Sequence, residues 1–262
     1  MERKRITVDP ERFPGEFRPL LQSAPVYDSS CSAAARVYFI DRDEGYYLKT
    51  SPVGTLQKEA ELTRFFHGKG LGPRVLACTQ SEGRDWLLTA RVPGEDCTHP
   101  LYMAEPTRLC DTLAELLRRL HDTDPTGCPM ANRTADYLAA ARRNYEAGRY
   151  DVQLFPPPWR FKTVEEAWRI AEEHGRFLRA DTLLHGDYCL PNVMLQGWRF
   201  SGFIDLGTGG VGDRHVDLFW ATWSLNYNLK TDRYRERFLD AYGRDKVQPE
   251  LFPVIAAIEV FE

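Results

Sequence analysis

The sequence predicts an α+β fold of two lobes, a β-rich N-terminal lobe over residues 1–92 and a mainly helical C-terminal lobe over residues 93–262. Short β-prone runs separated by turn residues dominate the first third of the chain. Apolar residues at helical spacing dominate the remainder. Between them, Pro93 and Gly94 open a polar connection that continues to about Pro100, and this break predicts the lobe boundary.

The N-terminal elements follow from alternating apolar runs and breaks. Strands are predicted over residues 36–40 and 46–49, on either side of a turn that ends in glycine. Residues 55–67 place apolar side chains on one helical face before two glycines, so they predict a helix. Two further strands are predicted over residues 74–80 and 85–92, and the second has the continuous apolar run of a buried strand.

Helical periodicity governs most of the C-terminal lobe. Five leucines of residues 107–121 share one stripe, which predicts a helix facing the core. Thr163 and Glu166 have the spacing of a capping box at a helix start, whereas the proline-rich residues 155–159 cannot form regular helix. The remaining predicted elements are a helix over residues 135–147 and two β-like runs over residues 193–195 and 200–204.

Composition limits the classes of function. The chain carries 34 basic and 38 acidic residues, a net charge of −4, which is unsuited to binding nucleic acid. No apolar run approaches the roughly 20 residues that span a bilayer, and the basic N-terminus is not followed by the apolar segment of a secretory signal. The six cysteines form no Cys-x-x-Cys pair, which argues against a zinc site and fits reduced thiols. We therefore expect a cytoplasmic protein without a nucleic-acid or membrane partner; its oligomeric state is not indicated.

The strongest chemical signal is the run His-Gly-Asp-Tyr-Cys-Leu-Pro-Asn over residues 185–192. The spacing of His185, Asp187 and Asn192 is that of a kinase catalytic loop, H-x-D-x-x-x-x-N. Thirteen residues later, Asp205 stands in the run Phe-Ile-Asp-Leu-Gly, where a metal-binding aspartate would follow such a loop. Each of these two sequence motifs is common by itself. Together, with a predicted β-hairpin between them, they indicate a kinase.

These residue types suit phosphoryl transfer, in which positioning and neutralisation of phosphate charge dominate. Asp187 is the candidate catalytic base, which would accept or orient the proton of the attacking hydroxyl and contribute about 10²–10⁴-fold in rate. Asn192 and Asp205 offer the hard oxygen ligands that Mg²⁺ prefers. His185 is expected to brace the loop by hydrogen bonding and not to touch the substrate.

The segment from His185 to Asp217 resembles the aminoglycoside phosphotransferase family, nearest its 3′-phosphotransferase branch, and the likeness extends more thinly from about residue 25 to the end. The resemblance implies a bilobal protein-kinase-like fold. It implies ATP and Mg²⁺ as cofactors, with GTP left open as the donor, and an aminoglycoside-like antibiotic as the hydroxyl acceptor. Phosphorylation of such a drug would confer resistance. Asp217 would brace the catalytic loop through hydrogen bonds.

The family pattern also implies a nucleotide site. Lys49 would hold the α- and β-phosphates, and Glu59 would pair with and orient this lysine, although a solvated lysine and a surface glutamate are the plain alternatives. Tyr47 would stack on adenine, unless it is a packed core tyrosine. Ala90 and Val92 would contact the edge of the adenine through their main chain.

The phosphate-covering loop departs from the protein-kinase pattern, because residues 29–35 contain serine, cysteine and alanine but no glycine. Small side chains still let backbone N–H groups approach a phosphate, and Ser32 is the candidate contact. A protein kinase is disfavoured because only twelve positions separate Asp205 from Asp217. A pseudokinase is disfavoured because all five expected nucleotide, metal and catalytic side chains are present.

The acceptor site is the least typical part. A polycationic drug requires carboxylates, and Asp151, Glu259 and Glu262 are the candidates, with Asp151 in a lid candidate over residues 145–161. Asn228 stands where the family would place an acidic residue. This reduced acidity leaves open a kinase of another small hydroxyl compound, such as a sugar, an amino alcohol or a different antibiotic.

Overall fold

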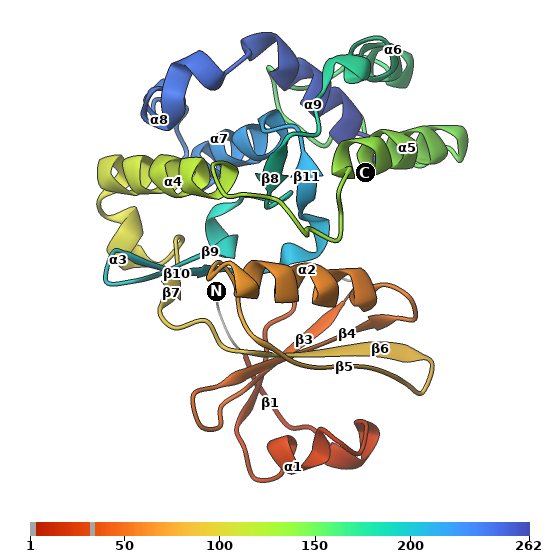
Figure 1. The fold of residues 1–262 in the computed structure, drawn as a ribbon, viewed down its shortest axis with the longest axis vertical. Coiled ribbons are helices and arrows are strands. Elements are labelled where there is room, and N and C mark those ends of the chain that lie inside the picture. Colours follow the sequence, from red (N-terminus) through yellow and green to blue (C-terminus); the bar gives the residue numbers. More distant parts are fainter. Residues whose placement is uncertain (1–3, 32–34) are drawn as a thin grey trace. The chain divides into compact units, whose positions relative to one another are not determined.

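The computed structural model describes residues 4–31 and 35–262. They divide into two compact units, each built from two segments of the chain (Figure 1). The first unit comprises the described part of Met1–Pro100 together with Pro191–Gly207. The second comprises Leu101–Leu190 and Thr208–Glu262.

A six-stranded antiparallel sheet forms the centre of the first unit, in the order β1-β2-β3-β4-β6-β5. The four strands predicted between residues 36 and 92 are confirmed within a few residues, whereas β1 and β2 were not predicted. The strands are β1 (Lys4–Ile6), β2 (Val26–Asp28), β3 (Arg36–Ile40), β4 (Tyr46–Pro52), β5 (Val75–Ser81) and β6 (Arg84–Ala90).

Alternating residues of β6 define the two faces of this sheet. Trp86 and Leu88 pack in the core cluster on the side of the N-terminal 3₁₀ helix η1 (Pro10–Arg12) and helix α1 (Arg18–Leu21). Leu87 packs instead against α2 (Leu56–Gly68), as the two-residue period of a strand requires. Figure 1 shows α1 and α2 on opposite sides of the sheet. Because Lys49 lies opposite Leu87 in the β4–β6 register, its side chain shares the face covered by α2.

A second, three-stranded sheet in the first unit has the order β10-β9-β7, with β7 (Glu95–Asp96), β9 (Val193–Gln196) and β10 (Arg199–Phe203). The two predicted β-like runs are therefore confirmed as β9 and β10. Their pairing with β7 places the segment after the catalytic loop in the first unit. Gly94 allows this approach, because a Cβ atom there would lie 2.1 Å from the Leu195 carbonyl oxygen.

The second unit is mainly helical, with one antiparallel pair of short strands, β8 (Thr182–Leu184) and β11 (Gly210–Gly212). These strands were not predicted. Its α-helices are α3 (Pro100–Met103), which begins at the last residue of the first segment, α4 (Pro106–His121), α5 (Arg133–Glu146), α6 (Val164–His174), α7 (His215–Leu229), α8 (Arg235–Gly243) and α9 (Phe252–Glu259). The short 3₁₀ helices along the chain are η2 (Gly175–Phe177), η3 (Leu190–Asn192), η4 (Leu206–Thr208), η5 (Arg244–Lys246) and η6 (Pro249–Leu251).

The helical patterns of the second unit are confirmed in detail. All five leucines of the predicted stripe on α4 are buried, and α4 packs against α7 and α8. Thr163 caps α6, and its hydroxyl accepts from the Glu166 N–H at 3.2 Å. The return contact differs from a capping box, because the Glu166 carboxylate accepts from the N–H of Lys162. Within the described ranges, no helix is long and apolar enough to cross a membrane.

Candidate active site

In the first unit, Lys49 lies between two carboxylates. Its Nζ is 2.8 and 3.0 Å from the two carboxylate oxygens of Glu59 on α2, and 2.9 Å from Oδ1 of Asp205. The predicted Lys49–Glu59 pair is therefore present, and Asp205 joins it from a position 156 residues away in the chain. We call these three residues the lysine triad.

The triad is enclosed on one side and open on the other. The side chains of Lys49 and Glu59 are 21% and 12% exposed, whereas that of Asp205 is 55% exposed and can reach a ligand. Asp205 has a φ of +57°, an uncommon conformation for a residue with a side chain and one found at functional sites. Gly207 allows Glu59 to come close, because a Cβ atom there would lie 3.3 Å from Oε2 of Glu59.

Charge in the triad favours an ionised lysine. Burial by itself lowers the pKa of Lys49, but the charges of Asp205 and Glu59 outweigh burial and raise that pKa. The pKa of Glu59 is raised, first by burial and then by the charge of Asp205, against the opposing effect of Lys49. With all three groups ionised, the triad carries one more negative charge than positive.

Asn192 lies next to Asp205 in the first unit. It is the last residue of η3, and it is buried. Its backbone carbonyl oxygen accepts from the N–H of Ile204, the residue before Asp205, at 3.0 Å. Across residues 4–31 and 35–262, no group of three or more His, Cys, Asp or Glu side chains could hold a metal ion by itself. One amide oxygen and one carboxylate fit Mg²⁺ that arrives with phosphate groups, because this ion is typically bound by few protein ligands plus phosphates and water.

The other residues predicted to contact the nucleotide are Tyr47, Ala90, Val92 and Ser32. Tyr47 lies on the face of the sheet that α2 covers, and its ring centroid is 5.2 Å from that of Phe39, its cross-strand partner on β3. The N–H of Ala90 donates to the Arg74 carbonyl at 2.9 Å, so a contact of Ala90 with adenine would use its carbonyl oxygen. Val92 is buried. Ser32 falls outside the described residues.

In the second unit, the catalytic loop follows β8 and is held by Asp217 on the first turn of α7. The backbone N–H groups of His185 and Gly186 donate to the two oxygens of the Asp217 carboxylate at 2.8 and 2.7 Å. This is the bracing that the resemblance implied. Gly186 has a φ of +87°, and a Cβ atom there would lie 2.0 Å from the carbonyl oxygen of Thr208, so this turn requires glycine. Asp187 comes next and is half-buried.

His185 serves the loop from within, as expected. It is fully buried, and its Nδ1 accepts from the N–H of Asp187 at 3.3 Å. Tyr188 is buried and donates its hydroxyl to the Leu113 carbonyl on α4 at 2.9 Å. The loop carrying Asp187 is therefore held both by α7 and by α4.

A buried network supports Asp217 from behind. Nε2 of His121 lies 3.1 Å from Oδ2 of Asp217, and Nδ1 of His121 lies 2.7 Å from the hydroxyl of Tyr242. Burial lowers the pKa of His121, and the nearby carboxylate only partly opposes it. Burial raises the pKa of Asp217, but the hydrogen bonds that its carboxylate accepts from His121 and from the backbone of His185 outweigh burial and leave that pKa lowered. A neutral imidazole therefore donates to an ionised carboxylate, and Tyr242 donates to the imidazole.

Asn228, which stands where an acidic residue was expected, helps to hold the catalytic loop. The side-chain amide of Asn228 donates to the carbonyl and hydroxyl oxygens of Ser224 at 2.8 and 3.2 Å. The same hydroxyl accepts from the N–H of Leu190 at 3.0 Å, three residues after Asp187. Asn228 thus reaches the catalytic loop through Ser224.

The other acceptor candidates differ in exposure. Glu259 is buried, and its Oε1 accepts from the Tyr137 hydroxyl at 2.6 Å and from Nε1 of Trp220 at 3.0 Å. Burial raises the pKa of Glu259. Asp151 and Glu262 are exposed, and the N–H of Asp151 donates to the carbonyl of Val260 at 2.9 Å, which ties the lid candidate to the C-terminal segment.

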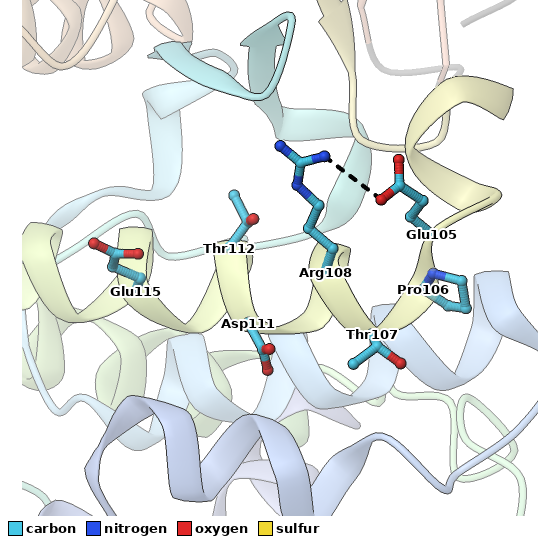
Figure 2. A pocket seen from close by; sticks show the side chains of 7 residues that line it. All are labelled: Glu105, Pro106, Thr107, Arg108, Asp111, Thr112 and Glu115. Atoms are coloured by element: carbon cyan, nitrogen blue, oxygen red, sulfur yellow. Dashed lines mark hydrogen bonds and ion pairs between the residues drawn. The ribbon is translucent and has the colours of Figure 1, made fainter.

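One surface hollow of the second unit does not coincide with these residues. It has a volume of about 410 Å³ and lies along the N-terminal half of α4. Figure 2 shows its charged and polar lining, in which Arg108 pairs with Glu105 at 3.5 Å. Asp111, also in the lining, is paired with Arg237. None of the predicted site residues lines it, so we do not assign the active site there.

Sequence reasoning did not single out His121, Ser224 or Arg133, which the structure places against the catalytic loop or against residues that contact it. His121 ends a predicted core helix, and nothing local distinguishes it from a helix-terminal histidine. Ser224 lies within a mostly apolar helix. Each of these residues acts through a contact with a residue far away in the sequence, and a local sequence pattern does not reveal such a contact.

Known proteins resemble this chain in both sequence and structure. Residues 31–252 match the profile of the phosphotransferase enzyme family. A protein of Lactococcus lactis subsp. lactis (strain IL1403), described as a probable aminoglycoside 3′-phosphotransferase, is 43% identical over 258 residues, which cover 98% of each chain.

Solved structures show the same fold. An aminoglycoside-3′-phosphotransferase of type VIII superposes with a TM-score of 0.74 at 25% identity, covering 99% of this chain and 94% of its own. An aminoglycoside phosphotransferase APH(3″)-Id from Streptomyces rimosus, in complex with ADP and streptomycin, gives 0.70 at 22% identity, covering 87% of this chain and 91% of its own. The predicted α+β, protein-kinase-like fold is confirmed.

Proposed function

Because this chain belongs to the phosphotransferase enzyme family, we propose that it transfers the γ-phosphate of ATP to a hydroxyl group of an aminoglycoside-like antibiotic and thereby confers resistance. The observation that supports this most directly is the lysine triad, in which Lys49 contacts both Glu59 and Asp205. GTP is an alternative donor. The predicted lobes, residues 1–92 and 93–262, would divide nucleotide binding from acceptor binding, and the reaction would take place in the cytoplasm.

Nucleotide binding would rest on the first unit. Lys49, oriented by Glu59, would donate to the α- and β-phosphates, and Tyr47 would pack against adenine. Asn192 and Asp205 would hold Mg²⁺, which when bound neutralises charge on the phosphates. Contacts of adenine with the main chain of residues 90–92 and of phosphate with Ser32 complete the proposed site.

Transfer would depend on Asp187. Its carboxylate would take the proton of the acceptor hydroxyl as the hydroxyl oxygen bonds to the γ-phosphorus. The bond from that phosphorus to the bridging oxygen breaks, and ADP leaves with the electron pair. Asp217 supports this role, because its two hydrogen bonds fix the residues directly before Asp187.

Acceptor recognition would involve Asp151, Glu259, Glu262 and Asn228. A second candidate function, a kinase of another small hydroxyl compound, is favoured by one observation. Glu259 already accepts from two neutral donors, so fewer of its lone pairs face a cationic ligand than for a solvated carboxylate.

The test is acceptor-dependent ADP release, with mass spectrometry of the product, across kanamycin-type, streptomycin-type and non-antibiotic hydroxyl compounds. The proposal expects one phosphate added to an aminoglycoside. Asp187→Asn should lower turnover by about 10²–10⁴-fold while ATP binding stays intact. Asp136→Asn, which changes an exposed carboxylate on α5, is the matched control. Turnover of Asp187→Asn at the wild-type rate would refute the assigned base, and activity on the non-antibiotic compounds alone would favour the second candidate.

A further inference from the structure

One buried guanidinium group in the second unit is incompletely paired. Arg133, the first residue of α5, is only 7% exposed, and its Nη1 is buried without a hydrogen-bond partner in the described part of the chain. The side chains of Arg91 and Arg235 also have an unpaired Nε, but neither residue is buried as a whole. A buried donor without a partner is rare in native proteins and calls for a ligand, a water or a functional role.

The rest of the Arg133 side chain is fixed. Its Nε donates to the carbonyl oxygen of Thr208 at 2.5 Å, and its guanidinium carbon lies 4.7 Å from the centroid of the Tyr137 ring. A planar group held by one hydrogen bond and by the ring has little freedom to turn away. Nη1 therefore has a defined position.

That position is close to the catalytic loop. The Thr208 carbonyl that Arg133 holds is the one that Gly186 approaches so closely that a Cβ atom would lie 2.0 Å from the oxygen. The hydroxyl of Thr208 also donates to the carbonyl of His185 at 3.5 Å. Arg133 is thus hydrogen-bonded to Thr208, whose carbonyl oxygen lies against Gly186, the residue that precedes Asp187.

The chemistry of the site favours an anionic ligand. The charge of Arg133 acts on one buried carboxylate, that of Glu259, whose pKa it helps to lower against the raising effect of burial. Oε1 of Glu259 is occupied by Tyr137 and Trp220, and no ion pair of Arg133 occurs among the described residues. An ammonium group of an acceptor would be repelled by Arg133. The anion that must come to a hydroxyl oriented by Asp187 is the phosphoryl group.

We propose that Arg133 is a further catalytic residue, whose Nη1 donates to a non-bridging oxygen of the phosphoryl group as it passes to the acceptor hydroxyl. This inference rests on the proposed function. A fixed donor in a buried site stabilises charge that develops during the reaction more than it stabilises the bound nucleotide. Arg133 should therefore affect turnover and the binding of transition-state analogues, and not the binding of ADP.

The experiment compares Arg133→Gln with Arg143→Gln, which removes an exposed arginine from the same helix. The readouts are kcat, KM for ATP, the affinity for Mg·ADP, and the affinity for Mg·ADP with aluminium fluoride in the presence of an acceptor. Arg133→Gln should lower kcat by about 10²–10³-fold and weaken the fluoride complex by a similar factor. KM for ATP and the Mg·ADP affinity should change less than about threefold. Arg143→Gln should match the wild type.

Two results would overturn the proposal. One is a folded Arg133→Gln variant with wild-type kcat. The other is an equal loss of affinity for Mg·ADP with and without fluoride, which would indicate a purely structural role. If Arg133→Gln does not fold, Arg133→Lys, which keeps the charge above Tyr137, is measured by the same criteria. A wild-type protein without phosphotransfer activity would refute the proposed function instead, and the fluoride complex would still report on Arg133.

Discussion

Replacing Asp217 by asparagine tests whether the catalytic loop is held in place by one buried carboxylate. The side chain is fully buried and accepts three hydrogen bonds, from the backbone N–H groups of His185 and Gly186 and from Nε2 of His121. Asparagine has nearly the same shape, but one of its two terminal groups is a donor. It cannot accept at both oxygen positions.

The loss in the free energy of unfolding depends on which of the two carboxylate oxygen positions the asparagine amide nitrogen takes. Oδ2 of Asp217 accepts from two donors and Oδ1 from one, so the least costly arrangement puts the nitrogen at Oδ1, against the N–H of Gly186. One charge-assisted bond worth about 1.5–3 kcal/mol is lost, and one buried N–H is left without an acceptor at about 1–3 kcal/mol. Because these costs overlap, we expect a loss of about 2–4 kcal/mol in the free energy of unfolding. At roughly 2–4 °C per kcal/mol, Tm should fall by about 5–15 °C.

Activity should fall more than stability alone explains, because the lost bond is at Gly186, next to Asp187. A displacement near 1 Å of a reacting group can cost about 10²-fold in rate. The matched control is Asp213→Asn. Asp213 is also buried and accepts from Arg179 and His215, but it does not contact the catalytic loop.

The assay combines urea unfolding with kcat measured well below both Tm values. Asp213→Asn should lose a comparable free energy of unfolding and keep its kcat, whereas Asp217→Asn should lose both. If Asp217→Asn kept wild-type Tm and kcat, the bracing assigned to this carboxylate would be wrong. If both variants lost activity equally, the loss would come from general destabilisation.

Three further predictions concern individual residues. Gly186→Ala should destabilise the protein and abolish turnover far more than Gly197→Ala, although both glycines have positive φ, because only the first would bring Cβ to 2.0 Å from the Thr208 carbonyl; equal urea midpoints would contradict this. The free energy of unfolding should fall as the pH drops below about 6.5, because His121 gains a proton in the unfolded chain but not in the folded protein, where its pKa is lowered. His121→Gln should reduce this pH dependence, as measured by urea titrations at several pH values. Asp205→Asn should weaken Mg·ATP binding in calorimetry while acceptor binding is kept, and unchanged nucleotide affinity would argue against its role as a metal ligand.

Most longer elements could be predicted from the sequence, because their patterns are local. The helix expected over residues 55–67 is Leu56–Gly68, and the helix expected over residues 107–121 is Pro106–His121. The strands that were missed, such as β8 and β11, have three residues each, too few for a two-residue period to be recognised. Their pairing joins segments far apart in the chain, which only the folded protein brings together.

The part of the candidate site that could be predicted is the part whose residues occur in a recognisable motif at a recognisable spacing. The pairing of Lys49 with Glu59 and the bracing of the loop by Asp217 were both expected from the resemblance, and the corresponding contacts are present. Arg133 could not have been found in this way. It begins an ordinary polar helix, and only its burial beside Thr208 distinguishes it from the other arginines of α5.

The charge of the lysine triad gives a reason why nucleotide and metal should bind together. Without a ligand, Lys49 is shared between Glu59 and Asp205, and the triad has an excess of one negative charge. A triphosphate approaching without a cation would meet the exposed carboxylate of Asp205, and like charges at short range oppose binding. On the proposed function, Asp205 would hold Mg²⁺ instead of repelling the phosphates, Lys49 would be left to the phosphates, and Glu59 would keep the lysine oriented. The enclosed part of the triad thus fixes the ammonium group, and the exposed carboxylate would make the proposed site selective for the magnesium complex.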